Sequence, residues 1–469
     1  MFRDFSPWIH LLLPHAGTIV GFSLAIVLVA RMGTERRPVT SAWAWLLAVV
    51  LVPWIGVPLY LGLGGRKLRR RVATKPKLYR GGHESFEGTS AERLLAASGA
   101  PSARAGNRCE LLSDGQTAFR RTIEAIAGAR RTIDLSTFIL AGDETGDGVV
   151  AALAEKARSG VRVRLLVDAL FAFRANRWAL SRLRAAGGHV AFFMPLVFRR
   201  PLQGHANLRN HRKLLIVDGE LAIAGGMNMA GEYMGPEPRD TRWRDVALAV
   251  RGPAARDVGQ VFESDWAFAT GESRPVAAEV TTDGAAEPGI SGGRVQVVAS
   301  GPDTLGDTLY ETVLTVVFEA RRRVAIATPY FVPDETLFRA LLLAARRGVE
   351  MTIIVPARSN HRLADLAGAG ALRDLEDAGA RVRPYGPGML HAKVFLVDDT
   401  VAMVGSANFD MRSLFLDFEL ALLCASPPEV AAIEGWFTET LRHCGESLAA
   451  IRQPKTFREG LARLVAPLV

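Results

Sequence analysis

Two short stretches of the chain combine histidine and lysine in a pattern suited to phosphate chemistry. The first reads HRKLLIVDG and the second, in the other half of the chain, reads HAKVFLVDD. The pattern fixes six residues, which are His211, Lys213, Asp218, His391, Lys393 and Asp398. A neutral imidazole can attack phosphorus, and a neighbouring ammonium group can hold the non-bridging oxygens. We take these six residues as the catalytic motifs.

The spacing within each motif predicts different places for the lysine and the aspartate. Side chains two residues apart on a strand share a face, so each lysine should lie beside its histidine. The aspartate comes seven residues after the histidine, which is roughly 23 Å of extended strand and the opposite face. If the strand is regular through the motif, Asp218 and Asp398 should fix the strand end rather than touch the reacting atoms.

Each motif is followed by an asparagine and then by a lone acid in an apolar run. GGMN and WRDVAL provide Asn228 and Asp245, and GSAN and DFELAL provide Asn408 and Glu419. A carboxylate buried without a partner is costly, and a carboxylate is the usual device that orients an imidazole. We therefore expect the acids to pair with the motif histidines and the asparagines to donate amide hydrogens to a phosphate.

A duplicated motif suggests two histidines with different tasks at one phosphorus atom. One would attack and become phosphorylated, while the other would protonate the departing alkoxide and then deprotonate the incoming alcohol. A single H-x-K on a strand would be weak support, because such a lysine is more often a solvated edge residue. The sequence has no His, Cys and carboxylate cluster at metal-ligand spacing, so we expect no metal and no cofactor.

The elements around the motifs are duplicated as well. Residues 116–140 and 307–332 each read as a helix followed by a buried strand, and residues 144–168 and 334–356 repeat that plan with a Gly-Val stop between helix and strand. Such alternation predicts an α/β fold. We expect two similar lobes, each a β-sheet flanked by helices, related by a pseudo-two-fold axis.

Composition and local sequence divide the chain into five expected parts. Hydrophobic residues make up 49% of the 469 residues, which favours a membrane segment attached to a soluble body. The expected parts are a transmembrane hairpin (1–65), a basic flank and linker (66–105), a first lobe (106–280), a linker (281–293) and a second lobe (294–469). The cysteines Cys109, Cys424 and Cys444 form no C-x-x-C pair, and we read them as reduced thiols.

The hairpin prediction depends on two uncharged apolar runs near residues 10–30 and 42–64. Each is long enough to cross a hydrocarbon core of about 30 Å as a helix. The start MFRDF is poor for a cleaved signal peptide, which is the alternative for the first run. The two runs therefore predict a two-helix membrane anchor in front of the lobes.

Cations beside the second run set the expected orientation. The cluster comprises Arg66, Lys67, Arg69, Arg70, Arg71, Lys75, Lys77 and Arg80. Positive flanks stay inside, which places both termini and the lobes in the cytoplasm. The cluster, with the formal charge of +9, could also hold anionic lipid head groups or serve only as a stop-transfer flank. The apolar and basic stretch 192–210 is open to three interpretations: a loop that dips into lipid, a loop that shapes the mouth of the substrate site, or a plain surface loop.

The two motifs resemble the H-x-K-x-x-x-x-D signature of the phospholipase D superfamily, and the chain is most similar to bacterial cardiolipin synthases. The resemblance rests on RRPVTSAWAWLLAVVLVPWIGVPLYLGLGG, RNHRKLLIVDGELAIAGGMNMAGEYMG and MLHAKVFLVDDTVAMVGSANFDMRSLFLDFEL, and covers nearly the whole chain. It implies transfer of a phosphatidyl group from one phosphatidylglycerol to His211 and then to a second phosphatidylglycerol, with release of glycerol. It also implies that His391 is the acid–base residue and that the protein is embedded in the bacterial inner membrane.

The chain departs from the family pattern in two places. DALFAFRANRWAL stands where many relatives have a glycine-rich Asp-Gly turn, and GGMN replaces the common Gly-Ser-x-Asn. The first departure leaves the phosphatidyl acceptor open. A hydrolytic phospholipase D would use the same residues, so release of phosphatidic acid is the alternative reaction. A nuclease is disfavoured because no aromatic residues alternate with the cations, and a noncatalytic scaffold would not need both motifs.

Overall fold

The computed structural model describes residues 26, 30, 46–52, 56, 75–79, 88–194, 208–272, 292–448 and 459. The chain divides into two compact units, one of residues 1–71 with 197–207 and the other of residues 72–196 with 208–469. In the first unit, the described residues 46–51 are helical. Most of the predicted membrane hairpin and most of the linker 281–293 fall outside the described residues. Within the described part of the chain, no helix has the length and apolar character needed to span a bilayer.

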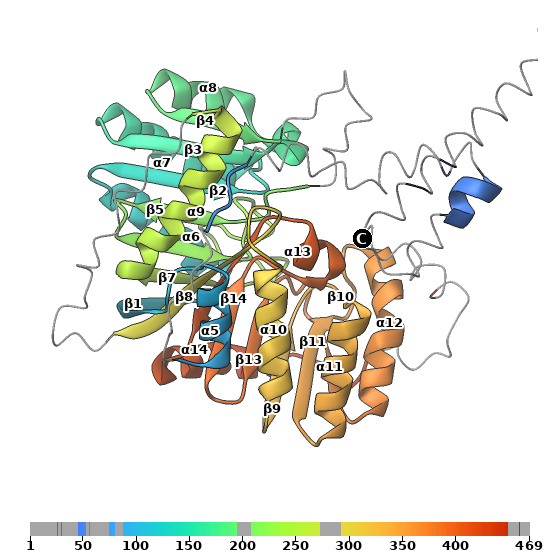
Figure 1. Ribbon diagram of the computed structural model, residues 1–469. Helices are drawn as coiled ribbons and strands as arrows, with labels where there is room; N and C mark the ends of the chain where they lie inside the picture. Colours follow the sequence, from blue (N-terminus) through green and yellow to red (C-terminus); the bar gives the residue numbers. More distant parts are fainter. Residues whose placement is uncertain are drawn as a thin grey trace, which may run out of the picture. The chain divides into compact units, whose positions relative to one another are not determined.

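The second unit is an α/β body whose two halves repeat one another (Figure 1). The first half contains α5 (Ser90–Ala97), β1 (Arg104–Leu112), α6 (Gly115–Gly128), β2 (Thr132–Thr137), α7 (Glu144–Arg158), β3 (Arg162–Asp168), the 3-10 helix η3 (Ala169–Arg174), α8 (Arg177–Ala185), β4 (His189–Phe193), β5 (Leu214–Val217), β6 (Leu221–Gly225), β7 (Ala247–Arg251) and α9 (Pro253–Thr270). The helix–strand pairs predicted near residues 116–140 and 144–168 are confirmed.

The second half follows the same plan. It contains β8 (Gly293–Ser300), α10 (Thr308–Glu319), β9 (Arg323–Ala327), β10 (Phe331–Val332), α11 (Glu335–Arg346), β11 (Glu350–Pro356), α12 (Arg362–Asp377), β12 (Arg381–Tyr385), β13 (Val394–Val397), β14 (Val401–Gly405), β15 (Phe409–Asp410), α13 (Met411–Phe415), β16 (Glu419–Cys424) and α14 (Pro427–Arg442). The pairs predicted near residues 307–332 and 334–356 are confirmed as well.

Fourteen strands of the described residues join in one mixed sheet. Its order is β12-β11-β9-β13-β14-β16-β8-β1-β7-β6-β5-β2-β3-β4. Reading outward from the β8–β1 junction gives equivalent strands on both sides, so the order itself shows the duplication. The lobes meet through a short antiparallel pairing in which Arg104 faces Val295 and Asn107 faces Gly293. The predicted α/β fold with two similar lobes is therefore confirmed.

Local sequence explains why equivalent helices begin and end at equivalent positions. Asp143 caps α7 by accepting a hydrogen bond from the backbone N of Gly146 at 2.9 Å, and Asp334 caps α11 through the backbone N of Leu337 at 3.1 Å. Such a cap contributes about 1 kcal/mol. Gly160 and Gly348 follow the two helices with φ of 88° and 89°, a conformation that glycine adopts without strain. Each copy of the repeat therefore turns from helix to strand, into β3 or β11, at the same point.

The two motifs lie at the carboxyl ends of β2 and β9, which are parallel to β3 and β11. β5 runs antiparallel to β2 with Leu214 opposite Ser136, so the residues just before β5 lie at the end of β2. In the second lobe Val394 lies opposite Ala327, which places the residues before β13 at the end of β9. All residues of β5 and β13 are buried. The sheet therefore holds the motifs from buried strands.

Two expectations about local structure were wrong. The range 82–105, read as a linker, contains α5, whose N-terminus has a capping box between Thr89 and Glu92. The motif strands were expected to begin at the histidines, but β5 begins at Leu214 and β13 at Val394. The His-x-Lys residues therefore lie outside regular strand. The expectation that side chains two residues apart share one face of a strand does not apply to them.

Candidate active site

A backbone hydrogen bond ties each histidine to the opposite lobe. The N–H of His211 donates to the carbonyl O of Phe418 at 2.9 Å, and the N–H of His391 donates to the carbonyl O of Arg244 at 2.8 Å. Phe418 precedes Glu419, and Arg244 precedes Asp245. Each motif is thus fixed beside the acid of the other lobe, and the two motifs come together in one site.

The acids pair with the histidines crosswise. Nδ1 of His211 lies 2.9 Å from Oε1 of Glu419, and Nδ1 of His391 lies 2.7 Å from Oδ2 of Asp245. Both carboxylates are fully buried. The sequence predicted the partner type but left open which imidazole each acid would meet. The structure pairs each acid with the histidine of the opposite lobe, so neither lobe contains a complete site.

These contacts fix the protonation of both rings. Burial alone would raise the pKa of Asp245 and Glu419, but the facing imidazole and the nearby lysines outweigh it and hold both pKa values below their usual range. An ionised carboxylate only accepts hydrogen bonds, so Nδ1 of each ring carries the hydrogen. Burial, reinforced by the neighbouring lysines, lowers the pKa of His211 to about 4 and that of His391 to about 3. At neutral pH both rings are uncharged, and Nε2 of each ring carries an electron pair, which in His391 faces Nζ of Lys393 at 3.0 Å.

The lysines supply the positive charge of the site. Nζ of Lys213 donates to the carbonyl O of His211 at 2.7 Å. Nζ of Lys393 lies 2.8 Å from Nδ1 and 3.0 Å from Nε2 of His391, and it also donates to the carbonyl O of that residue. Burial lowers the pKa of Lys213 to about 8 and that of Lys393 to about 7, against the opposing effect of the buried acids. The ammonium groups are therefore partly desolvated, which strengthens their attraction for an anionic oxygen.

The departure from Gly-Ser-x-Asn has a steric explanation. A Cβ atom on Gly226 would lie 2.4 Å from Oδ1 of Asp245, so no side chain fits there. At the equivalent position of the second lobe, the hydroxyl of Ser406 donates to Oε2 of Glu419. In the second lobe, Glu419 and Ser406 stand where the first lobe has the shorter Asp245 and Gly226. The carboxylate facing His211 thus has an extra side-chain donor that the carboxylate facing His391 lacks.

The motif aspartates lie away from the reacting groups. The carboxylate of Asp218 accepts hydrogen bonds from the backbone N atoms of Arg130, Arg131 and Thr132 at 2.7–2.9 Å. Asp398 does the same for the turn before β9, with backbone N atoms of residues 321–323. Both have positive φ, 55° and 49°. They close the turns from α6 to β2 and from α10 to β9. These turns lie at the opposite end of β5 and β13 from the histidines.

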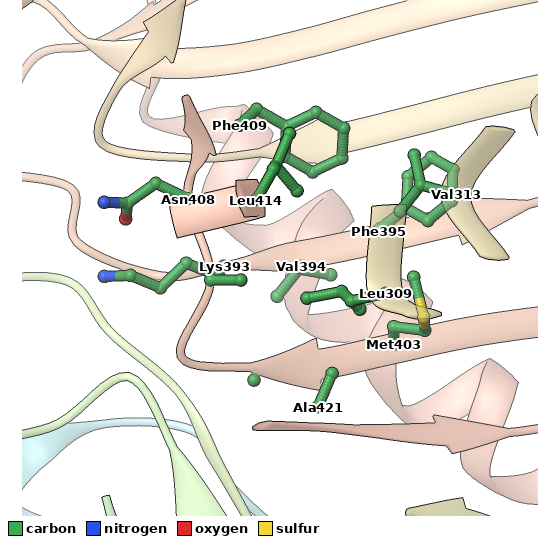
Figure 2. Close-up of a pocket in the computed structure, with 12 residues that line it drawn as sticks. Leu309, Val313, Lys393, Val394, Phe395, Met403, Asn408, Phe409, Leu414 and Ala421 are labelled. Atoms are coloured by element: carbon green, nitrogen blue, oxygen red, sulfur yellow. The ribbon is translucent and has the colours of Figure 1, made fainter. Parts of the chain in front are cut away.

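The two asparagines differ in their present partners. Oδ1 of Asn228 accepts from the backbone N of Ile139 at 3.0 Å, whereas Nδ2 of Asn408 donates to Oδ2 of Asp410 at 3.0 Å. Figure 2 shows the polar ends of Lys393 and Asn408 extending in the same direction, away from apolar side chains such as Phe395. The cavity that these residues line has a volume of about 30 Å³, which is room for a few water molecules at most. This cavity is too small for a lipid.

Aromatic side chains that the sequence did not single out wall both imidazoles. The ring of Phe138 meets His211 edge to face at 4.5 Å between centroids. Tyr233 meets His391 in the same way at 4.9 Å, and Trp243 lies 5.5 Å from it. Phe138 directly follows β2 and could have been found from its place after the strand. These rings pack against the imidazoles and cover part of each from solvent.

A buried charge network lies beneath the first motif, and the sequence did not predict it. Nζ of Lys75 lies 2.6 Å from Oδ1 of Asp265 and 2.5 Å from Oδ2 of Asp303, and Arg212 pairs with both acids at 2.7 and 3.3 Å. All four side chains are fully buried. Lys75 was grouped with the cations that could hold lipid head groups, and that assignment was wrong because its ammonium group is enclosed. Arg212 is the middle residue of the H-x-K motif, so this network supports the backbone between His211 and Lys213.

Among the described residues, no group of three or more His, Cys, Asp or Glu side chains is arranged to hold a metal ion.

Comparison with known proteins identifies similar chains along almost the entire length. The family described as "Cardiolipin synthase, PLD-like domain" matches residues 122–266 and 313–441, and "Phospholipase_D-nuclease N-terminal" matches residues 22–65. "Cardiolipin synthase 1" of Bacillus cereus is 34% identical over 96% of this chain and 92% of its own. "Major cardiolipin synthase ClsA" of Bacillus subtilis is 33% identical over 86% of both chains.

Solved structures share the fold at lower identity. The phosphatidylserine synthase of Haemophilus influenzae has a TM-score of 0.59 at 16% identity, covering 81% of this chain and 100% of its own. The polyphosphate kinase of Porphyromonas gingivalis has a TM-score of 0.51 at 16% identity, covering 76% of this chain and 52% of its own. At this identity the likeness shows the two-lobed fold alone.

Proposed function

The chain belongs to the cardiolipin synthase family of phospholipase D-like proteins, and we propose that it joins two phosphatidylglycerol molecules through a phosphohistidine intermediate. It is an enzyme of cardiolipin synthesis, as its relatives over nearly the full chain are. The observation that carries the mechanism is the crosswise pairing of His211 with Glu419 and of His391 with Asp245. This pairing places two neutral imidazoles in one site, each oriented by a buried carboxylate.

In the first half-reaction, Nε2 of His211 attacks the phosphorus of a phosphatidylglycerol. The bond from phosphorus to the head-group glycerol oxygen breaks, and His391 protonates that oxygen, so glycerol leaves and a phosphatidyl group remains on His211. Binding of the phosphodiester anion favours the protonated form of His391, which prepares it as the acid. Lys213 and Lys393, assisted by the amide groups of Asn228 and Asn408, stabilise the non-bridging oxygens.

In the second half-reaction, a hydroxyl group of another phosphatidylglycerol attacks the same phosphorus. His391 accepts the hydroxyl proton, the N–P bond breaks, and His211 returns to its neutral form with cardiolipin released. Two differences between the rings support this assignment. The side chain of His211 is 14% exposed against 6% for His391, and only the acid facing His211 has a serine donor.

The cellular setting belongs to the same proposal. An anionic lipid substrate and the match of residues 22–65 to an N-terminal family segment support a bilayer-embedded protein of the bacterial inner membrane. The cations between residues 66 and 80 favour a cytoplasmic position for the lobes. Phosphatidylglycerol is then the partner, and nucleic acid is not expected.

Lipid products distinguish the proposal from hydrolysis. Purified full-length protein in mixed micelles with phosphatidylglycerol should yield cardiolipin and glycerol in equal amounts, as measured by lipid mass spectrometry and a glycerol assay. Phosphatidic acid as the sole lipid product would show a phospholipase D, in which water replaces the second lipid. Cardiolipin formed from phosphatidylglycerol and phosphatidylethanolamine alone would overturn the choice of acceptor.

A further inference from the structure

Four exposed apolar side chains lie in equivalent segments of the two lobes. Among the described residues of the second unit, seven large apolar side chains are exposed, and four of them lie in the segments that follow β3 and β11. Phe173 and Trp178 are 75% and 83% exposed, and Leu363 and Leu366 are 49% and 37% exposed. We call residues 169–182 the first tip and residues 357–366 the second tip. Exposed apolar side chains therefore follow the equivalent strands β3 and β11 in both lobes.

Both tips lie on the side of the sheet that carries the histidines. β3 is parallel to β2, and β11 is parallel to β9, so the tips leave the sheet at the carboxyl ends where His211 and His391 lie. Because the two histidines share one site, the tips flank that site from either lobe. Figure 1 shows α8, which contains part of the first tip, next to β4, and α12, which begins within the second tip, next to α11.

A row of aromatic rings joins the first tip to the catalytic imidazole. Ring centroids are 4.5 Å apart between His211 and Phe138, 5.0 Å between Phe138 and Phe171, and 6.0 Å between Phe171 and Phe173. Asp168, at the end of β3, also accepts from the backbone N of Asn210 at 2.9 Å. The exposed ring of Phe173 is therefore the outer end of a packed row that begins at the site.

The charge around the tips fits an anionic surface. The sequence 169–188 contains four arginines and no acid; Arg174 pairs with Glu232 at 2.8 Å, and Arg177, Arg182 and Arg184 are exposed in the same segment as Trp178. The second tip contains Arg358 and Arg362, while its Asp365 accepts from the backbone N of Ser359 at 3.3 Å. Aromatic and aliphatic side chains among exposed arginines are the composition of surfaces that lie in the head-group region of anionic bilayers.

We propose that the two tips form a rim that rests in the head-group layer of the bilayer and holds the mouth of the site against its lipid substrate. Phe173, Trp178, Leu363 and Leu366 enter the apolar boundary, and the arginines contact lipid phosphates. A lipid substrate then reaches His211 without its acyl chains crossing water. This inference rests on the proposed function, since it takes the substrate to be a bilayer lipid.

The test compares one lipid chemistry in two physical forms. Full-length protein in nanodiscs is assayed with long-chain phosphatidylglycerol in the bilayer and with dihexanoyl-phosphatidylglycerol as a dissolved monomer. The double variants F173D/W178D and L363D/L366D should lower the ratio of bilayer to monomer activity by on the order of ten-fold. F318D is the matched control, because Phe318 is 50% exposed but precedes β9, at the amino end of the parallel strands. Its ratio should stay at the wild-type value.

The outcomes separate failure of the rim from failure of the reaction. An unchanged ratio in both tip variants, or equal loss on both substrates, would overturn the rim. Absence of phosphatidyl transfer by wild-type protein on either substrate would instead overturn the proposed function. Fluorescence tests the rim without turnover: brominated lipids should quench wild-type protein more than W178F, and equal quenching of the two would show that Trp178 does not reach lipid.

Discussion

At the residue scale, each imidazole receives its tautomer from the opposite lobe. Glu419→Gln should slow formation of the phosphohistidine by about 10²–10⁴-fold, because the amide cannot hold the His211 ring as an ionised carboxylate does. Asp245→Asn should mainly slow the steps that need His391 as acid and base. Rapid-quench trapping of the labelled phosphatidyl-enzyme, formed from an activated substrate whose leaving group needs no proton, separates the two effects because only attack by His211 then limits formation. If Glu419→Gln left phosphohistidine formation intact while Asp245→Asn stopped it, the roles of the histidines would be exchanged.

The direct controls remove the rings themselves. His211→Ala and His391→Ala should each abolish cardiolipin formation, and only His391→Ala should still accept a phosphatidyl group from an activated substrate whose leaving group needs no proton. Intensity of the trapped protein band on acid-free gels measures this. Turnover by either variant would show that the two-histidine mechanism is wrong.

The lysines should set the alkaline side of the pH profile. Lys213 and Lys393 lose their positive charge above pKa values of about 8 and 7, while the histidines are neutral above about 4 and 3. kcat/KM should therefore be flat through weakly acidic pH and decline as the pH rises through about 7 to 8. Lys393→Arg should move that decline to higher pH, since guanidinium keeps its charge. An acid limb near pH 6.5 with no alkaline decline would contradict these shifts.

At the element scale, residues 75–79 belong to the catalytic body. Lys75 neutralises Asp265 and Asp303, and the backbone N of Leu78 donates to the carbonyl O of Asp303 at 2.8 Å. Lys75→Met should lower the free energy of unfolding by about 3–5 kcal/mol, because it leaves buried carboxylates short of a cation. Lys77 donates to the backbone carbonyls of Pro302 and Thr304 and to no acid among the described residues, so Lys77→Met is the matched control with a small effect. Urea unfolding of the two variants in detergent measures the difference, and equal stability would contradict the role of the network.

The turns closed by the motif aspartates should matter for stability more than for chemistry. Asp218→Ala removes the acceptor of three backbone N–H groups at a residue with positive φ, which should cost about 1–3 kcal/mol. Asp218→Asn should cost less, because asparagine tolerates this conformation and retains one acceptor. Thermal unfolding checks the order of the three proteins. A large fall in kcat for protein that remains fully folded would show that Asp218 acts in the reaction.

At the scale of the whole molecule, the duplicated chain contains one site rather than two. The crosswise pairs join residues 208 and 146 positions apart in the same chain, so two damaged chains cannot assemble a working site between them. Nanodiscs that contain both His211→Ala and His391→Ala protein should show no more activity than either alone. Activity restored by mixing, measured by cardiolipin formation, would mean that lobes are exchanged between chains.

The sequence by itself determined the duplicated elements, the six motif residues and the types of the supporting residues. These features are local: helix caps, strand hydrophobicity and the cost of a lone buried acid can each be read within a few residues. The bounds of α7, α11, β3 and β11 follow from such signals, and so does the expectation that Asp245 and Glu419 would meet an imidazole.

Only the tertiary structure decided which groups meet. The crosswise exchange of Asp245 and Glu419 depends on how the two lobes join at β1 and β8, and no local signal specifies that junction. The burial of Lys75 was hidden for the same reason, because its acids lie far away in the sequence and an isolated lysine in a basic run reads as solvated. Contacts made over long sequence distances are fixed by packing of the whole body, and the active site of this chain is made of such contacts.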